Sequence, residues 1–530
     1  MENRLPIGTQ SFDTIRVEGY KYVDKTGLAW NLANSLRMAF LSRPRRFGKS
    51  LLVSTLDAYF SGRKELFEGL AAGELEDAWQ HYPVIRVDFS KRDYGIDGNF
   101  SDAVDSIICE HEEKYGVEAG SGANSRRFES LIRSLHRKFS KKVVVLVDEY
   151  DKPILDALYE PHEDMNRKLL RDFYSPLKAC DEHLRFVFLT GITKISHVNI
   201  FSGLNQLQDI SLSDKYSSVC GLTEQEVRSN FVGEIEALAD KMSLTSEQCF
   251  ERLRRKYDGY RFSGNGSDIY NPFCLLCAFE NQDMGSYWMT SGTPSMLVKS
   301  LENNIVEIND IMQDGREVGI RFFADYDSRN PDIAPLLYQA GYLTIKEYRP
   351  DIESYLIGFP NCEVSEGLLS CLLPKYLVGS ASDMVDISIE KMRRALFDGK
   401  AEEVAAILSS CVSGIPTILA DSCENYYESI VHVLFRVTGY EVVNQMQSSA
   451  GRADIVLQTP NRIWIFELKM DRGSKDIDRI CDEALEQISE KGYAKPYRAS
   501  GKEIHKVALV FSSNKKGLVD WKEEALEATF

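Results

Sequence analysis

The chain has 530 residues, of which 43% are hydrophobic, 11% aromatic and 27% charged, and this composition excludes a fully disordered, collagen-like or disulfide-scaffold protein. The length predicts about three domains, because a single hydrophobic core rarely grows beyond about 250–300 residues. The 63 Lys and Arg residues against 80 Asp and Glu residues give a formal charge of −17, so any contact with nucleic acid requires a local site.

The amino terminus and the cysteines indicate a cytoplasmic protein. Residues 1–6 lack the apolar core of a secretion signal, and no stretch approaches the roughly 18–20 apolar residues that cross a bilayer. The 11 cysteines are scattered, which is typical of reduced thiols. Cys274 and Cys277 form the one C-x-x-C pair and have no second ligand pair nearby, so we expect helix packing there, no zinc site and no membrane partner.

Short apolar runs alternate with amphipathic stretches between residues 38 and 190, which predicts an α/β fold with a parallel sheet and crossover helices. The expected strands are 38–42, 84–89, 143–148 and 185–190. The run at 143–147 is entirely apolar, as a strand buried on both faces requires. We therefore expect this strand at the centre of the sheet.

A phosphate-binding loop is predicted between the first strand and the helix that follows it. Backbone N–H groups at a helix amino terminus attract phosphate, so Gly48 and Lys49 are expected to bind the phosphates of ATP and Ser50 to bind Mg²⁺. The strict motif has glycine at position 43, where this chain has Arg43. The match is therefore incomplete, and an ordinary helix start is the alternative.

Two acidic residues stand at the end of the strand 143–148, where ligands bind in open parallel sheets. Asp148 is expected to hold Mg²⁺ and Glu149 to polarise the attacking water, the alternative being an acidic loop that caps the next segment. Thr190 ends the following strand and either senses the γ-phosphate or is a turn residue. Arg46, with Arg45, either neutralises phosphate charge or contacts another subunit or a nucleic acid.

The chain turns mainly helical after about residue 216, which indicates a separate middle module up to about residue 385. We assign this module no chemistry. Its expected elements are helices near 223–256 and 294–304 and short strands at 342–346 and 354–358. A helical pair at about 386–412 then leads to a third unit with its core at about 420–530, which opens with an amphipathic helix at 424–438.

A hairpin in this third unit is predicted to bring two carboxylates together. Pro460 disfavours a two-residue type I′ turn, so we expect a four-residue loop at 459–462. The resulting register places Asp454 opposite Glu467. Lys469 falls on the same face, because side chains alternate along a strand.

Two directly opposed carboxylates repel each other, which favours a cation between them. Asp454 and Glu467 are therefore expected to bind Mg²⁺ for phosphodiester hydrolysis, with Lys469 orienting the attacking water. The alternative is a solvated hairpin face on which Lys469 simply pairs with Glu467. Glu424 and Glu428 share a helix face and either approach the metal or are surface charges. Gln487 follows on a predicted helix and is assigned no role.

Several motifs along nearly the whole chain support a family resemblance. They are the residues at 22–26 (YVDKT), 43–50 (RPRRFGKS), 148–151 (DEYD), 200–205 (IFSGLN), 270–273 (YNPF) and 341–344 (GYLT), together with Asp454, Glu467 and Lys469. With these motifs the chain resembles the bacterial AAA-ATPase-like proteins that carry a PD-(D/E)XK nuclease-superfamily domain at the carboxyl end. Such relatives share the absent first glycine, but many have an acidic residue near Gln445, which leaves the number of metal ligands open.

The resemblance implies a P-loop ATPase domain at 1–215, a helical or winged-helix middle module at 216–385 and a restriction-endonuclease-like α/β domain at 386–530, with ATP and Mg²⁺ as cofactors. The leading hypothesis is an ATPase whose nucleotide state regulates a metal-dependent nuclease acting on DNA or RNA. The alternative is a signalling or defence ATPase whose nuclease-like domain binds nucleic acid without cleaving it. The intact carboxylate and lysine set favours the first, and a homo-oligomer is compatible with both.

Overall fold

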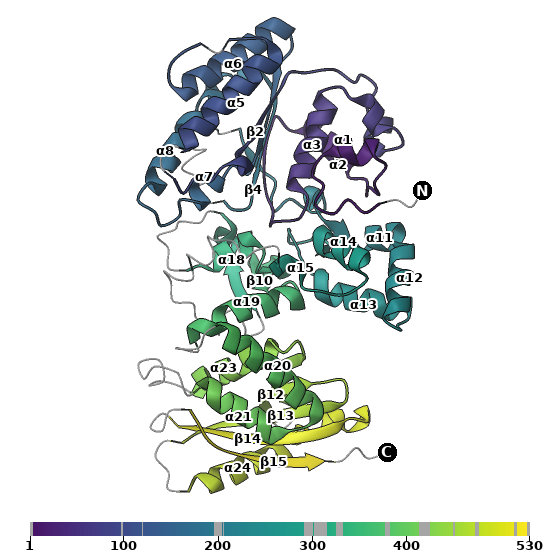
Figure 1. Cartoon of the computed structure of the whole chain (residues 1–530), viewed down its shortest axis with the longest axis vertical. Coiled ribbons are helices and arrows are strands. Elements are labelled where there is room, and N and C mark those ends of the chain that lie inside the picture. The colour runs from purple at the N-terminus through teal and green to yellow at the C-terminus, as the bar shows by residue number, and fades with distance from the viewer. Residues whose placement is uncertain are drawn as a thin grey trace. The chain divides into compact units, whose positions relative to one another are not determined.

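The chain forms two compact units, Met1–Asn361 and Cys362–Phe530, in a computed structural model (Figure 1). The structure describes residues 4–96, 99–118, 120–194, 204, 206–290, 300, 315–324, 332–376, 382–412, 424–448, 451–471, 476–512 and 517–526. The first unit contains the expected ATPase domain and most of the expected middle module. Within the described ranges, no helix combines the length and the apolar character that crossing a bilayer requires.

A five-stranded parallel sheet in the order β2-β3-β4-β1-β5 forms the middle of the amino-terminal half. The strands are β1 (Met38–Ser42), β2 (Val84–Asp88), β3 (Val143–Asp148), β4 (Leu184–Gly191) and β5 (Gln208–Asp209). The predicted parallel α/β sheet is thus confirmed. The prediction that β3 is central is wrong, because β4 occupies the middle of the strand order. The interiors of β3 and β4 are equally apolar and buried. Burial alone therefore cannot show which of two interior strands is the central one.

Helices cover both faces of this sheet, with α1 to α3 on one side and α5, α6 and α8 on the other (Figure 1). Their bounds are α1 (Phe12–Val17), α2 (Thr26–Ser35), α3 (Lys49–Phe60), α4 (Ala71–Leu75), α5 (Asn99–Tyr115), α6 (Asn124–Phe139), α7 (Lys152–Leu155), α8 (Glu163–Tyr174) and α9 (Pro176–Ala179). Short 3-10 helices lie at Lys64–Phe67, Phe89–Lys91, Asp181–His183 and Asp214–Tyr216. This layered arrangement buries β1, β3 and β4 and leaves their carboxyl ends at one edge.

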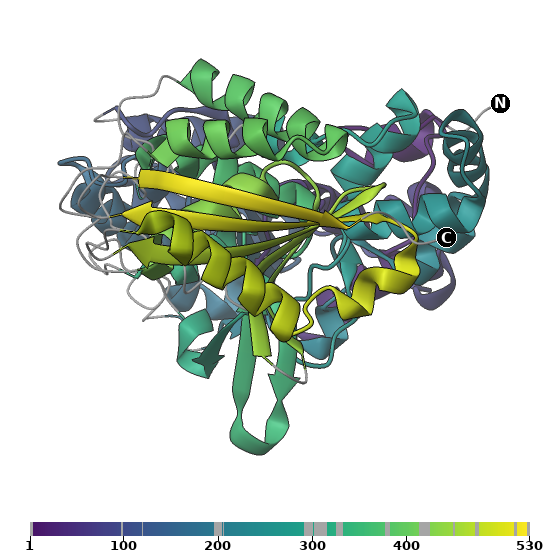
Figure 2. The ribbon, with the colours of Figure 1, turned by 90° about the horizontal axis from the view of Figure 1, so that it is seen from below.

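The rest of the first unit is helical with two small sheets. Its helices are α11 (Glu224–Asn230), α12 (Val232–Lys241), α13 (Ser246–Tyr257), α14 (Pro272–Asn281), α15 (Tyr287–Thr290) and α18 (Ala334–Ala340). Strand β6 (Leu222–Thr223) pairs with β7 (Ile269–Tyr270), and β8 (Arg316–Gly319), β9 (Thr344–Arg349) and β10 (Ser354–Gly358) form an antiparallel sheet in the order β8-β10-β9. Two further 3-10 turns are Ile320–Phe323 and Pro350–Ile352. The β9–β10 hairpin projects from the other elements (Figure 2).

Most predicted elements of this module are present. Helices α11 and α13 are preceded by the N-cap residues Thr223 and Thr245, and each threonine forms a capping box with the residue three positions later. Strands β9 and β10 confirm the two predicted strands, although β9 begins two residues later than expected. The helix expected at 294–304 lies outside the described residues except at Ser300.

The second unit has a five-stranded sheet in the order β11-β12-β13-β14-β15, in which only β13 and β14 are parallel. Its strands are β11 (Glu441–Ser448), β12 (Gly451–Gln458), β13 (Arg462–Asp471), β14 (Glu503–Ser512) and β15 (Gly517–Leu526). Its helices are α19 (Cys362–Tyr376), α20 (Ser382–Asp398), α21 (Ala401–Val412), α23 (Glu424–Arg436) and α24 (Ile477–Glu490), followed by a 3-10 turn at Lys495–Ser500. Helix α24 lies on one side of the sheet and the α20–α21 pair on the other (Figure 2).

Alternation along β13 divides its side chains between these two layers. Trp464 donates its indole N–H to Leu396 of α20 at 3.1 Å, and Phe466 packs against Phe435 of α23. Ile463 and Ile465 instead join a core cluster with Ile488 of α24. The odd-numbered residues of β13 therefore face α24, and Glu467 and Lys469 share that face.

Candidate nucleotide and metal sites

The loop from β1 to α3 has the backbone of a phosphate-binding turn. Gly48 directly precedes α3 and has φ 93°, in the left-handed region that favours glycine. A Cβ at Gly48 would meet no atom within 4 Å, so backbone conformation and not space selects glycine here. The free N–H groups at the start of α3 are the donors that an anion would accept from.

Lys49 lies inside this loop, with 7% of its surface exposed. Its ammonium donates to the backbone carbonyls of Arg43 at 2.9 Å and Pro44 at 3.0 Å. Burial lowers the pKa of Lys49, while the carboxyl groups of Glu149 and Asp148 oppose this shift. The loop thus folds around the charge that is expected to meet phosphate.

Arg43 stands where the strict motif has its first glycine, and its side chain does not fill the loop. Its buried guanidinium donates to the carbonyls of Ser42 and Ser211, both at 2.9 Å, and of Tyr216 at 3.2 Å. It also lies 4.2 Å from the ring centroid of Phe262. The side chain therefore points out of the loop and fastens it to the segment after β5.

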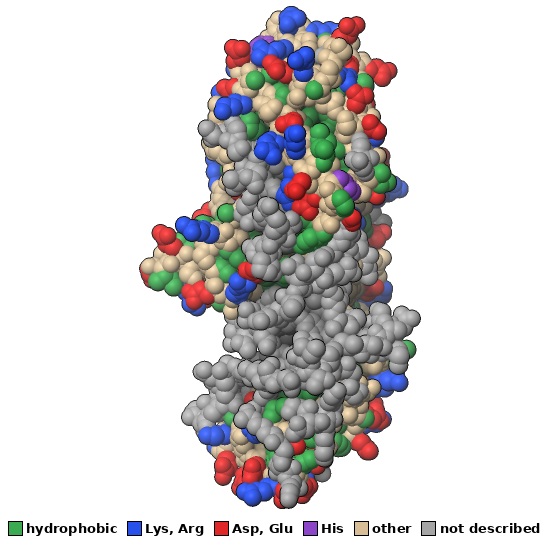
Figure 3. Space-filling model, turned by 90° about the vertical axis from the view of Figure 1, so that its left-hand side faces the viewer, with side chains coloured by type: hydrophobic (Ala, Val, Ile, Leu, Met, Phe, Trp, Pro, Cys, Tyr) green, Lys and Arg blue, Asp and Glu red, His purple; other side chains and the backbone are tan. Residues whose placement is uncertain are grey.

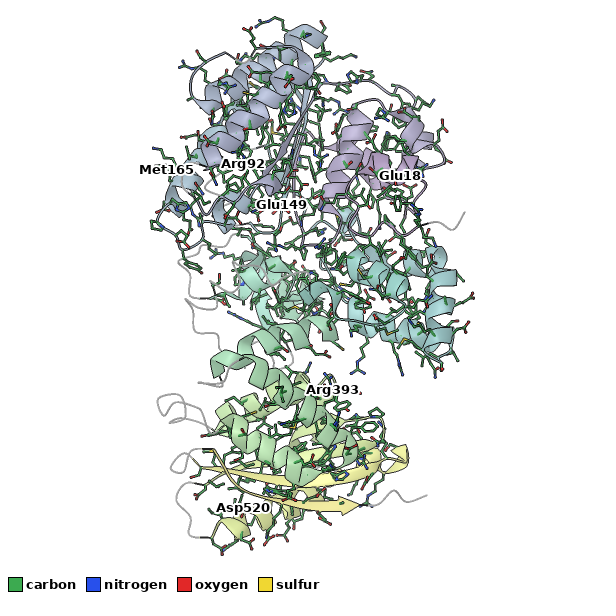
Figure 4. The ribbon with its side chains drawn as sticks, viewed as in Figure 1. Glu18, Arg92, Glu149, Met165, Arg393 and Asp520 are labelled. Atoms are coloured by element: carbon green, nitrogen blue, oxygen red, sulfur yellow. The ribbon has the colours of Figure 1, made fainter. Side chains whose placement is uncertain are left out.

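The two predicted acidic residues lie at the carboxyl end of β3, close to Lys49 and Ser50, and Figure 4 labels Glu149 at the lower end of the sheet. Burial raises the pKa of Asp148, against a hydrogen bond from Ser50 and the charge of Lys49. Burial also raises the pKa of Glu149, which has a left-handed backbone with φ 52°. The structure therefore brings Lys49, Ser50, Asp148 and Glu149 together.

Asp151 is a residue that the sequence reasoning missed. It is fully buried and accepts hydrogen bonds from the backbone of Ile192 at 3.1 Å and from the backbone and hydroxyl of Thr193 at 2.6 and 2.7 Å. A Cβ at Gly191 would lie 2.4 Å from its carboxylate. Asp151 thus ties the end of β3 to the end of β4. The D-E-x-D and T-G-I-T sequences carried the signal, but only their pairing in space reveals it.

The side chains of Thr190 and Arg46 make their contacts outside this carboxylate and lysine group. Thr190 is buried, and its hydroxyl donates to the carbonyl of Leu41 in β1 at 2.7 Å. A contact with the γ-phosphate therefore stays a prediction that would need this bond to break. Arg46 is exposed, has φ 69°, and lies 4.5 Å from the ring centroid of Phe273 in α14.

A mainly apolar cavity opens beside Gly48. Its wall comes from the segment before α2, from α3 and from the turn before β6, and includes Tyr22, Val23, Leu51 and Leu222. Lys25 stands in the same wall and pairs with Glu226 of α11 at 2.5 Å. The apolar side chains of this cavity would contact a flat apolar ring bound next to the phosphate loop.

The hairpin that carries the second site has the predicted register. Strands β12 and β13 pair from Gln458 with Ile463 to Ile455 with Phe466. The pairing ends one position before Asp454 and Glu467, and the carboxylate of Asp454 accepts the backbone N–H of Leu468 at 2.8 Å. The turn at 459–462 is closed by reciprocal bonds between Thr459 and Arg462.

Glu467 is the buried centre of this site, with 1% of its surface exposed. Burial raises its pKa to about 7, the charge of Asp454 adds to the shift, and Lys469 opposes it. The ammonium of Lys469 donates to Oε1 of Glu467 and to Oε1 of Gln487, both at 2.9 Å. The amide of Gln487 in turn donates to Glu467. Gln487 therefore belongs to the site, which its place on a later helix did not reveal.

The donor set fits a hard divalent cation. Oε2 of Glu467 is buried and has no hydrogen-bond partner among the described residues, and carboxylate oxygens are the ligands that Mg²⁺ prefers. Those residues contain no group of three or more His, Cys, Asp or Glu side chains that could hold a metal. Glu428 is thus not brought into such a group, and the side chains of Glu424 and Gln445 lie outside the described residues. Asp454 and Glu467 would hold the ion as a pair, with water or substrate completing its shell.

Comparisons with known proteins match the two parts of the chain that contain these residues. Residues 6–201 match the family model described as "Predicted AAA-ATPase", and residues 422–521 match that of the PD-(D/E)XK nuclease superfamily. The chain is also 34% identical over 544 residues to the "Uncharacterized protein in vnfD 5'region" of Azotobacter chroococcum mcd 1, a match that covers 99% of each chain. The similarity therefore extends across both units.

Proposed function

Because the chain belongs to the AAA-ATPase-like proteins that carry a carboxy-terminal PD-(D/E)XK nuclease-superfamily domain, we propose that it binds and hydrolyses ATP and that its nucleotide state regulates a metal-dependent nuclease. The substrate of that nuclease is DNA or RNA, bound at a local site in an acidic chain. The observation that carries the proposal is the buried Glu467, which keeps one unpartnered carboxylate oxygen beside Asp454 among the described residues.

In the proposed ATP complex, the ammonium of Lys49 changes its hydrogen-bond acceptors. Its ammonium now donates to two carbonyls of its own loop, and the phosphate oxygens would replace them as acceptors. Ser50 and Asp148 would hold Mg²⁺, which supplies charge stabilisation to the leaving phosphate. Glu149 would accept a proton from the attacking water, a role that its raised pKa favours. The apolar cavity beside Gly48 would take the base.

Phosphodiester cleavage rests on Asp454, Glu467 and Lys469. The two carboxylates would hold a divalent ion, which stabilises the negative charge that develops on the scissile phosphate. Lys469 is 30% exposed while its partner Glu467 is buried, so its ammonium can reach an attacking water from the solvent side. Gln487 holds both side chains in place through its amide.

Regulation is supported by contacts that lead from the phosphate loop to the end of the first unit. Phe47 packs edge-on against Tyr260, with ring centroids 4.8 Å apart. The neighbouring Gly259 fits so closely that a Cβ there would lie 2.2 Å from the carbonyl oxygen of Pro360. Asn361 ends the unit. A loop that moves when phosphate binds would therefore displace the segment at which the second unit begins.

The test is incubation of the full chain with single- and double-stranded DNA and RNA, Mg²⁺ or Mn²⁺, and ATP, ADP or no nucleotide. We expect metal-dependent cleavage of at least one substrate, at a rate that changes with the nucleotide. Asp454→Ala and Glu467→Ala should each abolish it, and Lys49→Ala should make it insensitive to ATP. Cleavage that persists without Asp454 would refute the assignment of the site.

The alternative of a signalling or defence ATPase that binds nucleic acid without cutting it has one observation in its favour. In the described part of the chain, the metal pair lacks a third carboxylate, and Glu467 is already bonded to Lys469 and Gln487. Binding of all four substrates with no cleavage in any nucleotide state would support this alternative. The same experiment therefore decides between the two functions.

A further inference from the structure

A basic segment joins α6 to β3 at the edge of the sheet opposite the phosphate loop. Arg137, Lys138, Lys141 and Lys142 fall within six residues, and all four are exposed. In the described structure none of them forms an ion pair with a carboxylate; Lys138 donates to two backbone carbonyls at the end of α5. In a chain of charge −17, four adjoining unpaired cations create a local positive field.

Two carboxylates near this segment are paired with other cations, Asp181 with Arg37 and Glu129 with Arg133. A third, Glu182, contacts the ring of His183. Burial lowers the pKa of His183, and the positive charges of Arg133 and Lys142 add to this shift against the pull of Glu182. Figure 3 shows Lys and Arg side chains beside a histidine, among scattered carboxylates, at the top of the view. Asp181 and Glu129 are therefore neutralised by cations outside the segment, whereas Glu182 keeps its negative charge beside a neutral His183.

A cavity of about 210 Å³ lies beside this segment and has aromatic and amide walls. Its rings are Tyr59, Phe60, Trp79 and Tyr82, its amides Asn34 and Gln80, and its cation Arg185. The guanidinium of Arg185 lies 5.6 and 5.9 Å from the ring centroids of Phe60 and Tyr82. Lys141 links the segment to the cavity, because its ammonium donates to Gln80 at 2.8 Å and lies 5.8 Å from the centroid of Tyr82.

The cavity wall is held in a strained conformation. Trp79 has φ 37°, which is unfavourable for a bulky residue, and its carbonyl oxygen lies 3.3 Å from where a Cβ on Gly62 would stand. The indole N–H of Trp79 is buried and has no hydrogen-bond partner within the described ranges. The one carboxylate of the wall, Glu76, already accepts from Trp30 at 3.0 Å and from Tyr59 at 2.5 Å. The cavity thus offers rings and donors but little free acceptor capacity.

We propose that this cavity and the basic segment together bind single-stranded nucleic acid. A base would enter the cavity and stack on its half-buried rings, Tyr59, Trp79 or Tyr82, while the phosphates follow the cations of the segment. A duplex keeps its bases stacked inside the helix and would lose the first contact. An acidic peptide would use the cations but leave the aromatic cavity empty. The surface belongs to the ATPase domain, so it acts in addition to the nuclease site and does not depend on it.

The first test measures the affinity of the full chain for a labelled 12-nucleotide single strand by fluorescence anisotropy, with EDTA to prevent cleavage. The variant Lys141→Gln/Lys142→Gln should bind more weakly, and its slope of log affinity against log salt should fall by about 1.4, since each single-strand phosphate contact contributes about 0.7. The matched control Lys241→Gln/Arg252→Gln removes the same charge from exposed positions on α12 and α13 and should change the affinity less than about twofold.

The second test addresses the base. Tyr82→Ala should weaken single-strand binding by about tenfold or more and leave duplex binding unchanged, and a tryptophan quench on binding should vanish in Trp79→Phe. DNA and RNA probes distinguish the two polymers. Unchanged affinity in both Lys141→Gln/Lys142→Gln and Tyr82→Ala would overturn the proposal. An equal loss of duplex affinity in Tyr82→Ala, or equal binding of an oligoglutamate peptide, would also overturn it. If Tyr82→Ala does not fold, the affinity and salt dependence of Lys141→Gln/Lys142→Gln decide whether the proposal holds.

Discussion

The protonation of Glu467 should control metal binding at the carboxy-terminal site. Its pKa is raised to about 7 by burial and by the charge of Asp454. Below pH 7 a proton occupies the carboxyl group and competes with the metal, whereas above pH 7 the carboxylate is free. At pH 6 only about one molecule in ten is ionised, so the affinity should be about tenfold weaker at pH 6 than at pH 8.

Calorimetry of the full chain with Mn²⁺ in the absence of nucleotide would measure this dependence. Lys469→Met removes the neighbouring charge that lowers the pKa of Glu467. The rise of metal affinity with pH should therefore occur at a higher pH in Lys469→Met than in the wild type. Glu467→Gln carries no titrating group and should show weak binding that does not change over the same range. Equal wild-type affinities at pH 6 and pH 8 would refute the reasoning, because they would show that no proton leaves Glu467 when the metal binds.

The same group should also affect stability, because the folded state holds its proton more tightly than the unfolded state does. The shift from the ordinary value of 4.5 to about 7 corresponds to about 3 kcal/mol, an upper figure for a coupled pair. This stability is fully present below pH 4.5 and is lost as the pH rises through 7. Glu467→Gln should therefore stabilise the second unit at pH 8, and a melting temperature below that of wild type at this pH would contradict the burial argument.

Three further predictions follow from the two sites. Lys49→Ala should abolish binding of Mg-ATP, whereas Glu149→Gln should retain binding and lose turnover. An unchanged calorimetric affinity of Lys49→Ala for Mg-ATP would refute the assignment of this loop as the phosphate-binding loop. Arg43→Gly restores the usual glycine but removes three buried hydrogen bonds, so it should cost about 2 kcal/mol or more and lower the melting temperature. Gln487→Ala should reduce cleavage at least about tenfold while metal affinity changes less than about threefold, because it frees Lys469 to move.

Local sequence patterns were sufficient for the elements that depend on local chemistry. The strands at 38–42 and 143–148 match the structure to the residue, since buried parallel strands are continuous apolar runs bounded by polar turns. The hairpin register also agrees, because a proline in the turn sets the loop length and the loop length sets the pairing. These predictions needed no knowledge of distant contacts.

Contacts between segments far apart in the sequence could not be predicted from local sequence patterns. Arg43 counted against the phosphate loop as a departure from the motif, and its partners at residues 211 and 216 lie about 170 positions away. Gln487 reaches Glu467 only because β13 and β14 are parallel, so the connection between them must cross the sheet, and α24 covers the face that carries the site. The place of β4 between β1 and β3 likewise depends on pairing that no single strand encodes.

The residues that were missed have one physical property in common: each belongs to a hydrogen-bond network around a buried charged group. Asp151 accepts three hydrogen bonds from Ile192 and Thr193, and Gln487 bridges a carboxylate and an ammonium. A charge taken out of water is tolerated only when such partners surround it, and the partners must come from whichever segment the fold brings near. Motifs therefore reveal the groups that perform the chemistry, whereas the groups that hold them in place become visible only in three dimensions.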